Sequence, residues 1–231
     1  MFLRRLRDTL QFFWLHLTEL LWRLAPVALP FLLFGNYRFV MIHAGDTEKA
    51  MSDPLTLLPQ MLAGVAATAL TIVYTLRKLQ VGKDPSPGLA TLWREAAWGF
   101  PSLLAVQLLA GAAILGGLLL LILPGIYLMG ALLPAYVIAV HERQAPVAAL
   151  KASWARYRGQ AWALGADVLL LVPCLLIIFS GLGALEQLLN DTPDIIRVVA
   201  MSALDLVAML FAQLPGILLA RFYVMEDISA N

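Results

Sequence analysis

The sequence has few residues of the kinds that build disulfide frameworks and water-facing surfaces. It contains one cysteine, Cys174, so no disulfide can form within the chain. Charged residues occupy 13% of its 231 positions, about half their share in soluble domains, whereas hydrophobic residues occupy 61%. A chain of this composition cannot cover its folded surface with polar groups. The composition therefore predicts that the protein folds in a lipid bilayer.

Residues that carry catalytic or metal chemistry are also scarce. The three histidines, His16, His43 and His141, fall in separate segments, and the motifs HExxH, paired CxxC and GxSxG are absent from the sequence. The segment 80–88 (QVGKDPSPG) lacks the spacing of a phosphate loop and instead predicts a turn-rich linker. We therefore expect no enzymatic activity, no cofactor and no metal site. The basic residues flank apolar stretches, which favours anionic lipid headgroups over nucleic acid as their partner.

Long apolar stretches dominate the chain, and each is long enough to cross the ~30 Å of bilayer hydrocarbon. The stretch 101–140 has no charged residue, and a straight helix of that length would measure ~60 Å. We expect it to fold back at Leu123-Pro124-Gly125, because proline removes a backbone donor and glycine permits a sharp turn. The predicted fold class is all-α, a polytopic membrane helical bundle in one domain. Its six spans are expected at about 24–43, 54–76, 101–122, 124–140, 161–183 and 195–221.

Three other segments predict amphipathic helices at the membrane surface. In residues 1–23, apolar residues that include Phe13 and Leu20 recur on one helical face, which continues to Leu24. That face either lies on lipid or packs on the bundle, and the sequence favours neither. The segments 89–100 and 146–158 show the same pattern. In the latter the expected apolar face consists of Val147, Leu150, Trp154 and Tyr157.

The distribution of charge predicts the orientation. The segments 1–23, 77–95 and 141–160 hold 12 of the 16 basic residues, and an even number of crossings places all three on one side. The loops 44–53 and 184–194 carry one basic residue against six acidic residues. The positive-inside rule then places both termini in the cytoplasm.

Three charged residues fall well inside the expected spans, away from the span ends, and a charge costs ~2.5–3.5 kcal/mol at a helix centre. Asp205 lies near the middle of the last span and Arg38 in the outer half of the first. We expect them to form an ion pair if their helices are neighbours. Asp167, near the cytoplasmic end of the fifth span, is expected to be snorkelling or hydrated at the interface. The alternative is that Asp205 lines a polar cavity or an ion path.

Two repeated patterns concern packing. Small residues recur four positions apart in Ala63–Ala67–Thr71, in Ala112–Gly116 and in Ala161–Gly165, a spacing that allows helices to approach closely. The fragment LPGI occurs at 123–126 and again at 214–217. Two interpretations of this fragment stay open, an internal duplication and a chance match.

The segment 123–160 carries a family resemblance. A Pro-Gly step at Pro124 and Gly125 precedes a span, and an Ala-Leu-x-x-Ser-Trp helix follows and ends in a basic residue and glycine. The matching residues of that helix are Ser153, Trp154, Arg158 and Gly159. The pattern resembles the YciC-like bacterial inner-membrane proteins and, more loosely, the membrane domain attached to some glycerophosphodiester phosphodiesterases. The resemblance covers residues 100–225. It implies a six-helix inner-membrane protein without an assigned biochemical function, and it carries over no catalytic residue.

The sequence leads to two hypotheses about function. In the first, the protein is a non-enzymatic component of the bacterial inner membrane that organises or assists other proteins through contacts with lipid, a partner membrane protein or a second copy of itself. In the second, it is a small transporter or lipid-handling protein with a polar cavity near Asp205. The two differ in whether Asp205 and Asp167 line one hydrated cavity or are held by neighbouring side chains.

Overall fold

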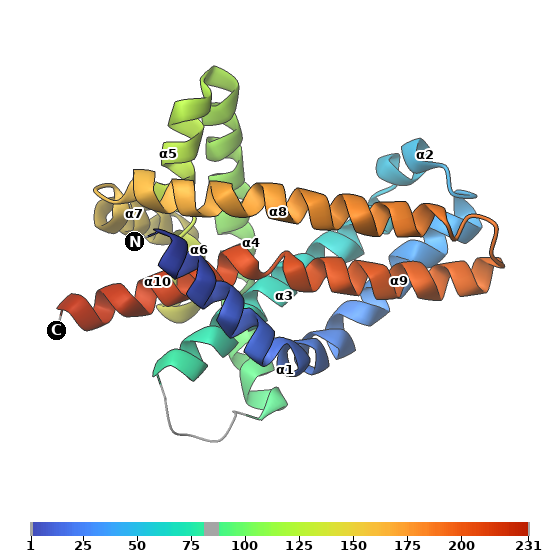
Figure 1. Ribbon diagram of the computed structural model, residues 1–231, viewed down its shortest axis with the longest axis horizontal. Coiled ribbons are helices and arrows are strands. Elements are labelled where there is room, and N and C mark those ends of the chain that lie inside the picture. The colour runs from blue at the N-terminus through green and yellow to red at the C-terminus, as the bar shows by residue number, and fades with distance from the viewer. Residues whose placement is uncertain (1, 81–87, 231) are drawn as a thin grey trace. The chain divides into compact units, whose positions relative to one another are not determined.

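The computed structural model describes residues 2–80 and 88–230, with the side chains of 5–79 and 88–225. All regular secondary structure in these residues is helical (Figure 1). Six segments are long and apolar enough to cross a membrane, which confirms the predicted fold class and the number of spans. Residues 81–87, most of the predicted linker, lie outside the described part of the chain. The candidate spans are Arg5–Ile42, Pro54–Leu79, Leu89–Leu120, Ile122–His141, Ala161–Gln187 and Asp194–Met225.

The predicted surface helix at the N-terminus and the first span form one continuous helix. Helix α1 (Phe2–Tyr37) runs through Pro26 and Pro30 and passes directly into the π-helix η1 (Arg38–Ile42). The short helix α2 (Thr47–Ser52) and the long α3 (Pro54–Gln80) follow. Of the two alternatives for the apolar face of α1, the structure supports packing on the protein. The predicted face residues Phe13, Leu20 and Leu24 are all buried.

The stretch 101–140 folds back as predicted, but not at the predicted residues. Helix α4 (Leu89–Leu120) absorbs the expected surface helix 89–100, and α5 (Ile122–Leu132) returns beside it (Figure 1). The break is at Leu121, whose φ of −163° and ψ of 143° are extended. Pro124 and Gly125 instead lie in the first turn of α5. The predicted break at Pro124-Gly125 is therefore wrong. The backbone N–H groups of the first helical turn have no partner within the helix, so a proline in that turn removes no hydrogen bond and does not break the helix.

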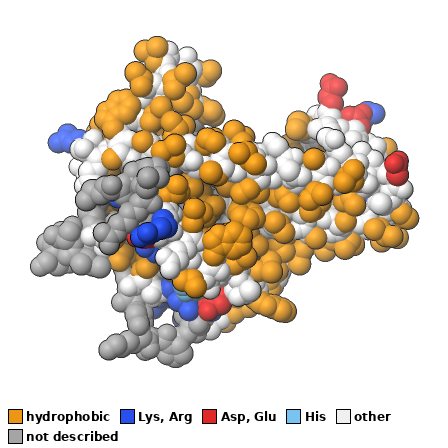
Figure 2. Space-filling model, in the orientation of Figure 1, with side chains coloured by type: hydrophobic (Ala, Val, Ile, Leu, Met, Phe, Trp, Pro, Cys, Tyr) orange, Lys and Arg blue, Asp and Glu red, His pale blue; other side chains and the backbone are white. Residues whose placement is uncertain are grey.

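Gly125 has a packing role in this hairpin. A Cβ at Gly125 would overlap the Leu118 side chain, and a Cβ at Gly117 would come within 3.1 Å of the Gly125 Cα. The two glycines therefore let α4 and α5 approach closely near the tip. The tip itself is apolar, since Leu119, Leu120 and their neighbours through Leu123 are exposed. Figure 2 shows hydrophobic side chains along this hairpin.

The second half of the chain contains five more helices. These are α6 (Ala135–His141), α7 (Pro146–Tyr157), α8 (Ala161–Gln187), α9 (Asp194–Phe211) and α10 (Leu214–Ala230). The last span is thus interrupted before Leu214, and each copy of LPGI lies at the start of a helix. The predicted helix 146–158 is present as α7, but the prediction of which residues form its buried face is wrong in part. Ala149, Ser153 and Tyr157 are buried, whereas Val147 and Trp154 are exposed.

Contacts divide the structure into two compact units. Unit 1 comprises Met1–His16, Thr68–Pro173 and Leu214–Asn231, and unit 2 comprises Leu17–Ala67 and Cys174–Gln213. In unit 1, α5 and α8 meet where a Cβ at Gly130 would overlap the Ala161 carbonyl and one at Gly165 would overlap the Ile126 carbonyl. The predicted small-residue step Ala161–Gly165 is therefore a helix crossing.

Unit 2 has an apolar core that α9 forms with α1 and with η1. Ala28, Leu32 and Leu206 form one buried cluster, and Val40, Val198 and Met201 form another. The two clusters fix the register of the first and last spans within this unit.

Candidate functional site

A polar cluster lies inside the candidate spans, between α1 and α9 of unit 2. The Asn36 amide donates to the Asp205 carboxylate at 2.7 Å and to the Ser202 hydroxyl at 3.2 Å. Ser202 donates in turn to the Val198 carbonyl at 2.7 Å. Asn36 and Ser202 are buried, and Asp205 is partly exposed. Among the described residues, Asp205 is thus bonded to a neutral amide and forms no ion pair.

Helical periodicity explains why Asn36 occupies this position. Ala28, Leu32 and Asn36 are spaced by four residues and lie on one face of α1, the face that packs on Leu206. Arg38 is two residues further on, which turns it ~200° around the helix axis. The predicted ion pair between Arg38 and Asp205 is therefore wrong, although α1 and α9 are neighbours.

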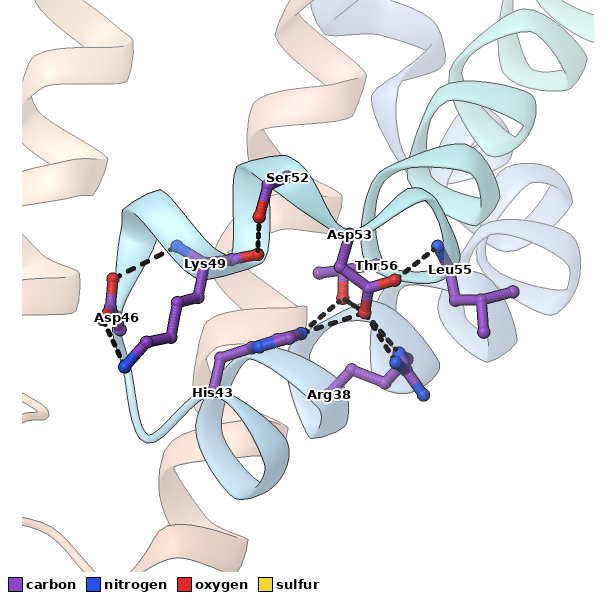
Figure 3. A network of polar contacts seen from close by, with 8 residues as sticks. All are labelled: Arg38, His43, Asp46, Lys49, Ser52, Asp53, Leu55 and Thr56. Carbon is purple, nitrogen blue, oxygen red and sulfur yellow. Dashed lines mark hydrogen bonds and ion pairs between the residues drawn. The ribbon is translucent and has the colours of Figure 1, made fainter.

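Arg38 belongs instead to a network that joins the end of the first span to the start of the second (Figure 3). Its guanidinium donates to the Asp53 carboxylate from Nη2 at 2.5 Å and from Nε at 3.2 Å. The His43 Nε2 lies 2.9 Å from the same carboxylate oxygen, and the Thr56 hydroxyl donates to it at 3.0 Å. Three polar side chains therefore converge on one carboxylate oxygen of Asp53, and all four residues belong to unit 2.

Asp53 also begins α3. Its second carboxylate oxygen accepts from the Leu55 backbone N–H at 3.0 Å, and Pro54 occupies the first helical position, an arrangement typical of a helix N-terminus. The Arg38 guanidinium, and after it the His43 imidazole, hold the pKa of the Asp53 carboxyl well below its usual value of 3.8. Asp53 is therefore a charged anchor over the whole physiological pH range. Next to it, Asp46 caps α2 by accepting from the Glu48 and Lys49 backbone N–H groups.

Asp167 is neither snorkelling nor hydrated, so this expectation is wrong. Its side chain is 3% exposed, and its carboxylate lies 3.1 Å from the Arg5 Nη1 of α1, within unit 1. The Arg5 guanidinium also lies over the Phe222 ring, 5.1 Å from the ring centroid. The structure therefore places Asp167 and Asp205 in different units and brings neither of them to Arg38.

The residues that carry the family resemblance hold α7 against α5 in unit 1. The Ser153 hydroxyl is buried and donates to the Ala131 carbonyl at 2.7 Å. The Trp154 ring packs edge-on against Tyr127 at 5.6 Å, and the Tyr127 hydroxyl donates to the Arg158 carbonyl at 3.1 Å. A Cβ at Gly159 would meet open space, so Gly159 is not required for close packing. These contacts give the motif a structural role.

Two partners went unrecognised in the sequence. The position of Arg5 in the basic N-terminal segment predicts a place at the membrane surface and not an ion pair. Asp53 lies in an acidic loop, but the pair Asp53-Pro54 before an apolar run is a helix-start signal that could have identified it. No sequence rule connects Arg5 with Asp167, which is 162 positions away.

Neither the search for metal-ligand groups nor the comparison with known proteins identifies a further functional site. No group of three or more His, Cys, Asp or Glu side chains is arranged to hold a metal ion within residues 2–80 and 88–230. No protein-family model, curated protein or solved structure matches this chain.

Proposed function

We propose that the chain is a multi-pass protein of the bacterial inner membrane that acts through contacts of its helices with lipid and with other membrane helices. The observation that carries this proposal is that two charged residues inside the spans are held in internal ion pairs. Asp167 and Arg38 are held in ion pairs with Arg5 and Asp53. A coupled transporter uses charged groups that line a path. Charges held in internal ion pairs serve the fold instead.

The outward face of α4 provides evidence for contact with a partner helix. The steps Ala161–Gly165 and Ala63–Ala67–Thr71 are buried in the structure, whereas Ala112 is exposed and Gly116 is partly exposed. A Cβ at Gly116 would have no heavy atom within 4 Å outside its own helix. In lipid, close approach of small-residue faces is a main source of helix association. We therefore propose that Ala112 and Gly116 contact a helix of a second membrane protein or of a second copy of this chain.

The membrane and orientation proposed here have two supports. The segments 1–23, 77–95 and 141–160 carry most of the basic residues, which favours both termini in the cytoplasm. The resemblance to the YciC-like proteins favours the bacterial inner membrane.

Site-specific photo-crosslinking in native membranes tests the proposal. A photoreactive residue at Ala112 or Gly116 is expected to give protein adducts of discrete mass. The same residue at Ile177, an exposed position of α8, serves as the matched control and is expected to give lipid adducts only. Gly116→Leu should abolish the adduct at position 112 without lowering the melting temperature. Lipid adducts alone at Ala112 and Gly116 would contradict the proposal.

Asp205 favours the second candidate function, a small transporter or lipid-handling protein. Its carboxylate accepts a hydrogen bond from a neutral amide and stays partly exposed inside the last span. A carboxylate without a cation can gain and lose a proton during transport. Purified protein in proteoliposomes with an internal pH-sensitive dye tests this. Proton flux that Asp205→Asn abolishes and Asp167→Asn retains would establish the transporter and displace the first proposal.

A further inference from the structure

Unit 1 contains a cavity of about 290 Å³ between α3, α4 and the end of α6. One part of its wall is apolar and consists of Val73, Leu76 and Val140. The other part carries ionisable side chains, which are Arg77, Glu95, His141 and Arg143. The volume is close to the lower end of the ~300–1,000 Å³ found for small-molecule sites. The cavity therefore offers both an apolar and a charged surface to one ligand.

Close packing of α6 on α4 positions the charged wall. A Cβ at Gly99 would lie 3.1 Å from the Val140 Cα, so only glycine allows this approach without a shift. Glu95 is one turn before Gly99, and His141 directly follows Val140. One turn beyond Gly99 on the other side, the Ser102 hydroxyl donates to the Gln144 carbonyl at 2.6 Å. The connection between α6 and α7 is thereby held on α4.

Arg143 lies in that connection with an unusual backbone. Its φ of 55° is in the left-handed region, which non-glycine residues rarely adopt. The residues on both sides are fixed. Glu142 accepts from the Tyr223 hydroxyl at 2.7 Å and from the Gln144 amide at 2.8 Å. Such a conformation persists where the surroundings over-determine it, and it is common at ligand sites.

The charges of the wall do not cancel. Arg77 forms two hydrogen bonds with Glu95, so these two side chains neutralise each other. Arg143 makes no ion pair with any described residue, and its side chain lines the cavity. His141 stands edge-on to the Tyr223 ring, with the ring centroids 5.6 Å apart. The lining thus carries one guanidinium, that of Arg143, which no described carboxylate neutralises.

We propose that this cavity binds a phosphate ester, with Arg143 on the phosphate and the wall of Val73, Leu76 and Val140 on the carbon part of the ligand. The planar guanidinium fork matches phosphate oxygens and forms strong charge-assisted hydrogen bonds. The apolar wall favours an anionic phospholipid over inorganic phosphate. The assignment to lipid rests on the membrane orientation of the proposed function, because segments 77–95 and 141–160 are those expected at the cytoplasmic leaflet, where anionic lipids attract basic residues.

Native mass spectrometry of the purified full chain in detergent tests the site. Phosphatidylglycerol, phosphatidylcholine and inorganic phosphate are added separately. We expect phosphatidylglycerol to be retained and Arg143→Gln to weaken its binding about 10- to 100-fold, the loss that charge-assisted hydrogen bonds imply. Arg94→Gln is the matched control, since Arg94 is exposed in the same basic segment and does not line the cavity. We expect it to change binding less than about twofold.

A second variant separates ligand binding from folding. Arg143→Gly removes the guanidinium and suits the positive φ, so we expect an unchanged or higher melting temperature together with lost binding. Saturation by inorganic phosphate with the same dependence on Arg143 would support the site and identify a soluble phosphate as its ligand. Absence of binding by either anion, or equal losses in Arg143→Gln and Arg94→Gln, would overturn the site. These results are independent of the crosslinks at Ala112 and Gly116, so the two proposals can fail separately.

Discussion

Asp167 and Asp205 are both carboxylates inside spans, but their partners differ in charge. Asp167 is buried beside the Arg5 guanidinium, whereas Asp205 is partly exposed and bonded to the Asn36 amide. Loss of one partner from a buried ion pair leaves an uncompensated charge, which costs ~3–5 kcal/mol in soluble proteins. Loss of a neutral donor costs less, because hydrogen bonds between membrane helices average ~0.6 kcal/mol. We therefore assign Asp167 to the fold and regard Asp205 as the side chain that is able to titrate.

The Asn36–Asp205 bond predicts a specific coupling in a double-mutant cycle. Asn36→Ala and Asp205→Ala should be non-additive in free energy of unfolding by about 0.6–1.7 kcal/mol, because both remove the same hydrogen bond. Arg38→Ala with Asp205→Ala is the control and should be additive, since Arg38 is bonded to Asp53. Thermal melting in detergent measures both cycles. Coupling in the control cycle and none in the first would restore the Arg38–Asp205 pair.

The low pKa of Asp53 predicts how the Arg38–His43–Asp53 network responds to pH. A carboxyl whose pKa is lowered in the folded state stabilises it fully above the usual value of 3.8 and loses this contribution as the pH falls further. In a His43→Gln background, which removes the imidazole from the network, Asp53→Asn should lower the melting temperature by the same amount at every pH from about 8 to 5. The difference should shrink only below about pH 4. A difference that already disappears near pH 6 would show that Asp53 is not held as a carboxylate.

The partner of Asp205 could have been predicted from the sequence, whereas the partner of Asp167 could not. The predicted pair of Arg38 with Asp205 depends on their depths along the helices, and depth does not say in which direction around the helix axis a side chain points. The spacing of Ala28, Leu32 and Asn36 contains that direction and would have selected Asn36. Arg5 and Asp167 meet through tertiary packing of chain segments far apart in sequence, which no local pattern encodes.

Among the helices, the α4–α5 hairpin shows how one residue type serves two roles. Proline ends a helix when it follows one, but it also starts a helix when its missing N–H falls in the first turn. In this chain the second role applies, and the turn is made by the extended Leu121. The length of the apolar stretch and the charges on its flanks predicted two helices. The residue at the turn depended on the packing of Gly117 on Gly125, which those patterns do not contain.

The crossing of α5 and α8 gives a prediction for substitutions of glycine. Gly130→Ala and Gly165→Ala should each destabilise the protein by about 1–3 kcal/mol or more, because the added methyl group meets a backbone carbonyl that cannot rotate away. Gly116→Ala is the matched control and should gain about 0.5–1 kcal/mol, since alanine favours the helix and its Cβ meets open space. Denaturant titration in detergent compares the three. Equal effects at Gly130 and Gly116 would exclude the close crossing.

At the scale of the whole molecule, two basic segments and the two acidic loops lie in different units. Segments 77–95 and 141–160 belong to unit 1, and loops 44–53 and 184–194 belong to unit 2. Span length and hydropathy were sufficient to predict six candidate spans, because hydrocarbon thickness acts on each span independently. The division into two compact units was not predictable, since it depends on contacts between spans.

Accessibility of single cysteines tests the central claim, that six crossings leave the basic segments on one side and the acidic loops on the other. On a Cys174→Ala background, an impermeant maleimide is added to intact spheroplasts that carry one cysteine each. Glu48→Cys and Asp191→Cys should be labelled from outside, and Lys151→Cys should be labelled only after the membrane is permeabilised. Labelling of Lys151→Cys in intact spheroplasts, or protection of either loop position, would contradict the account.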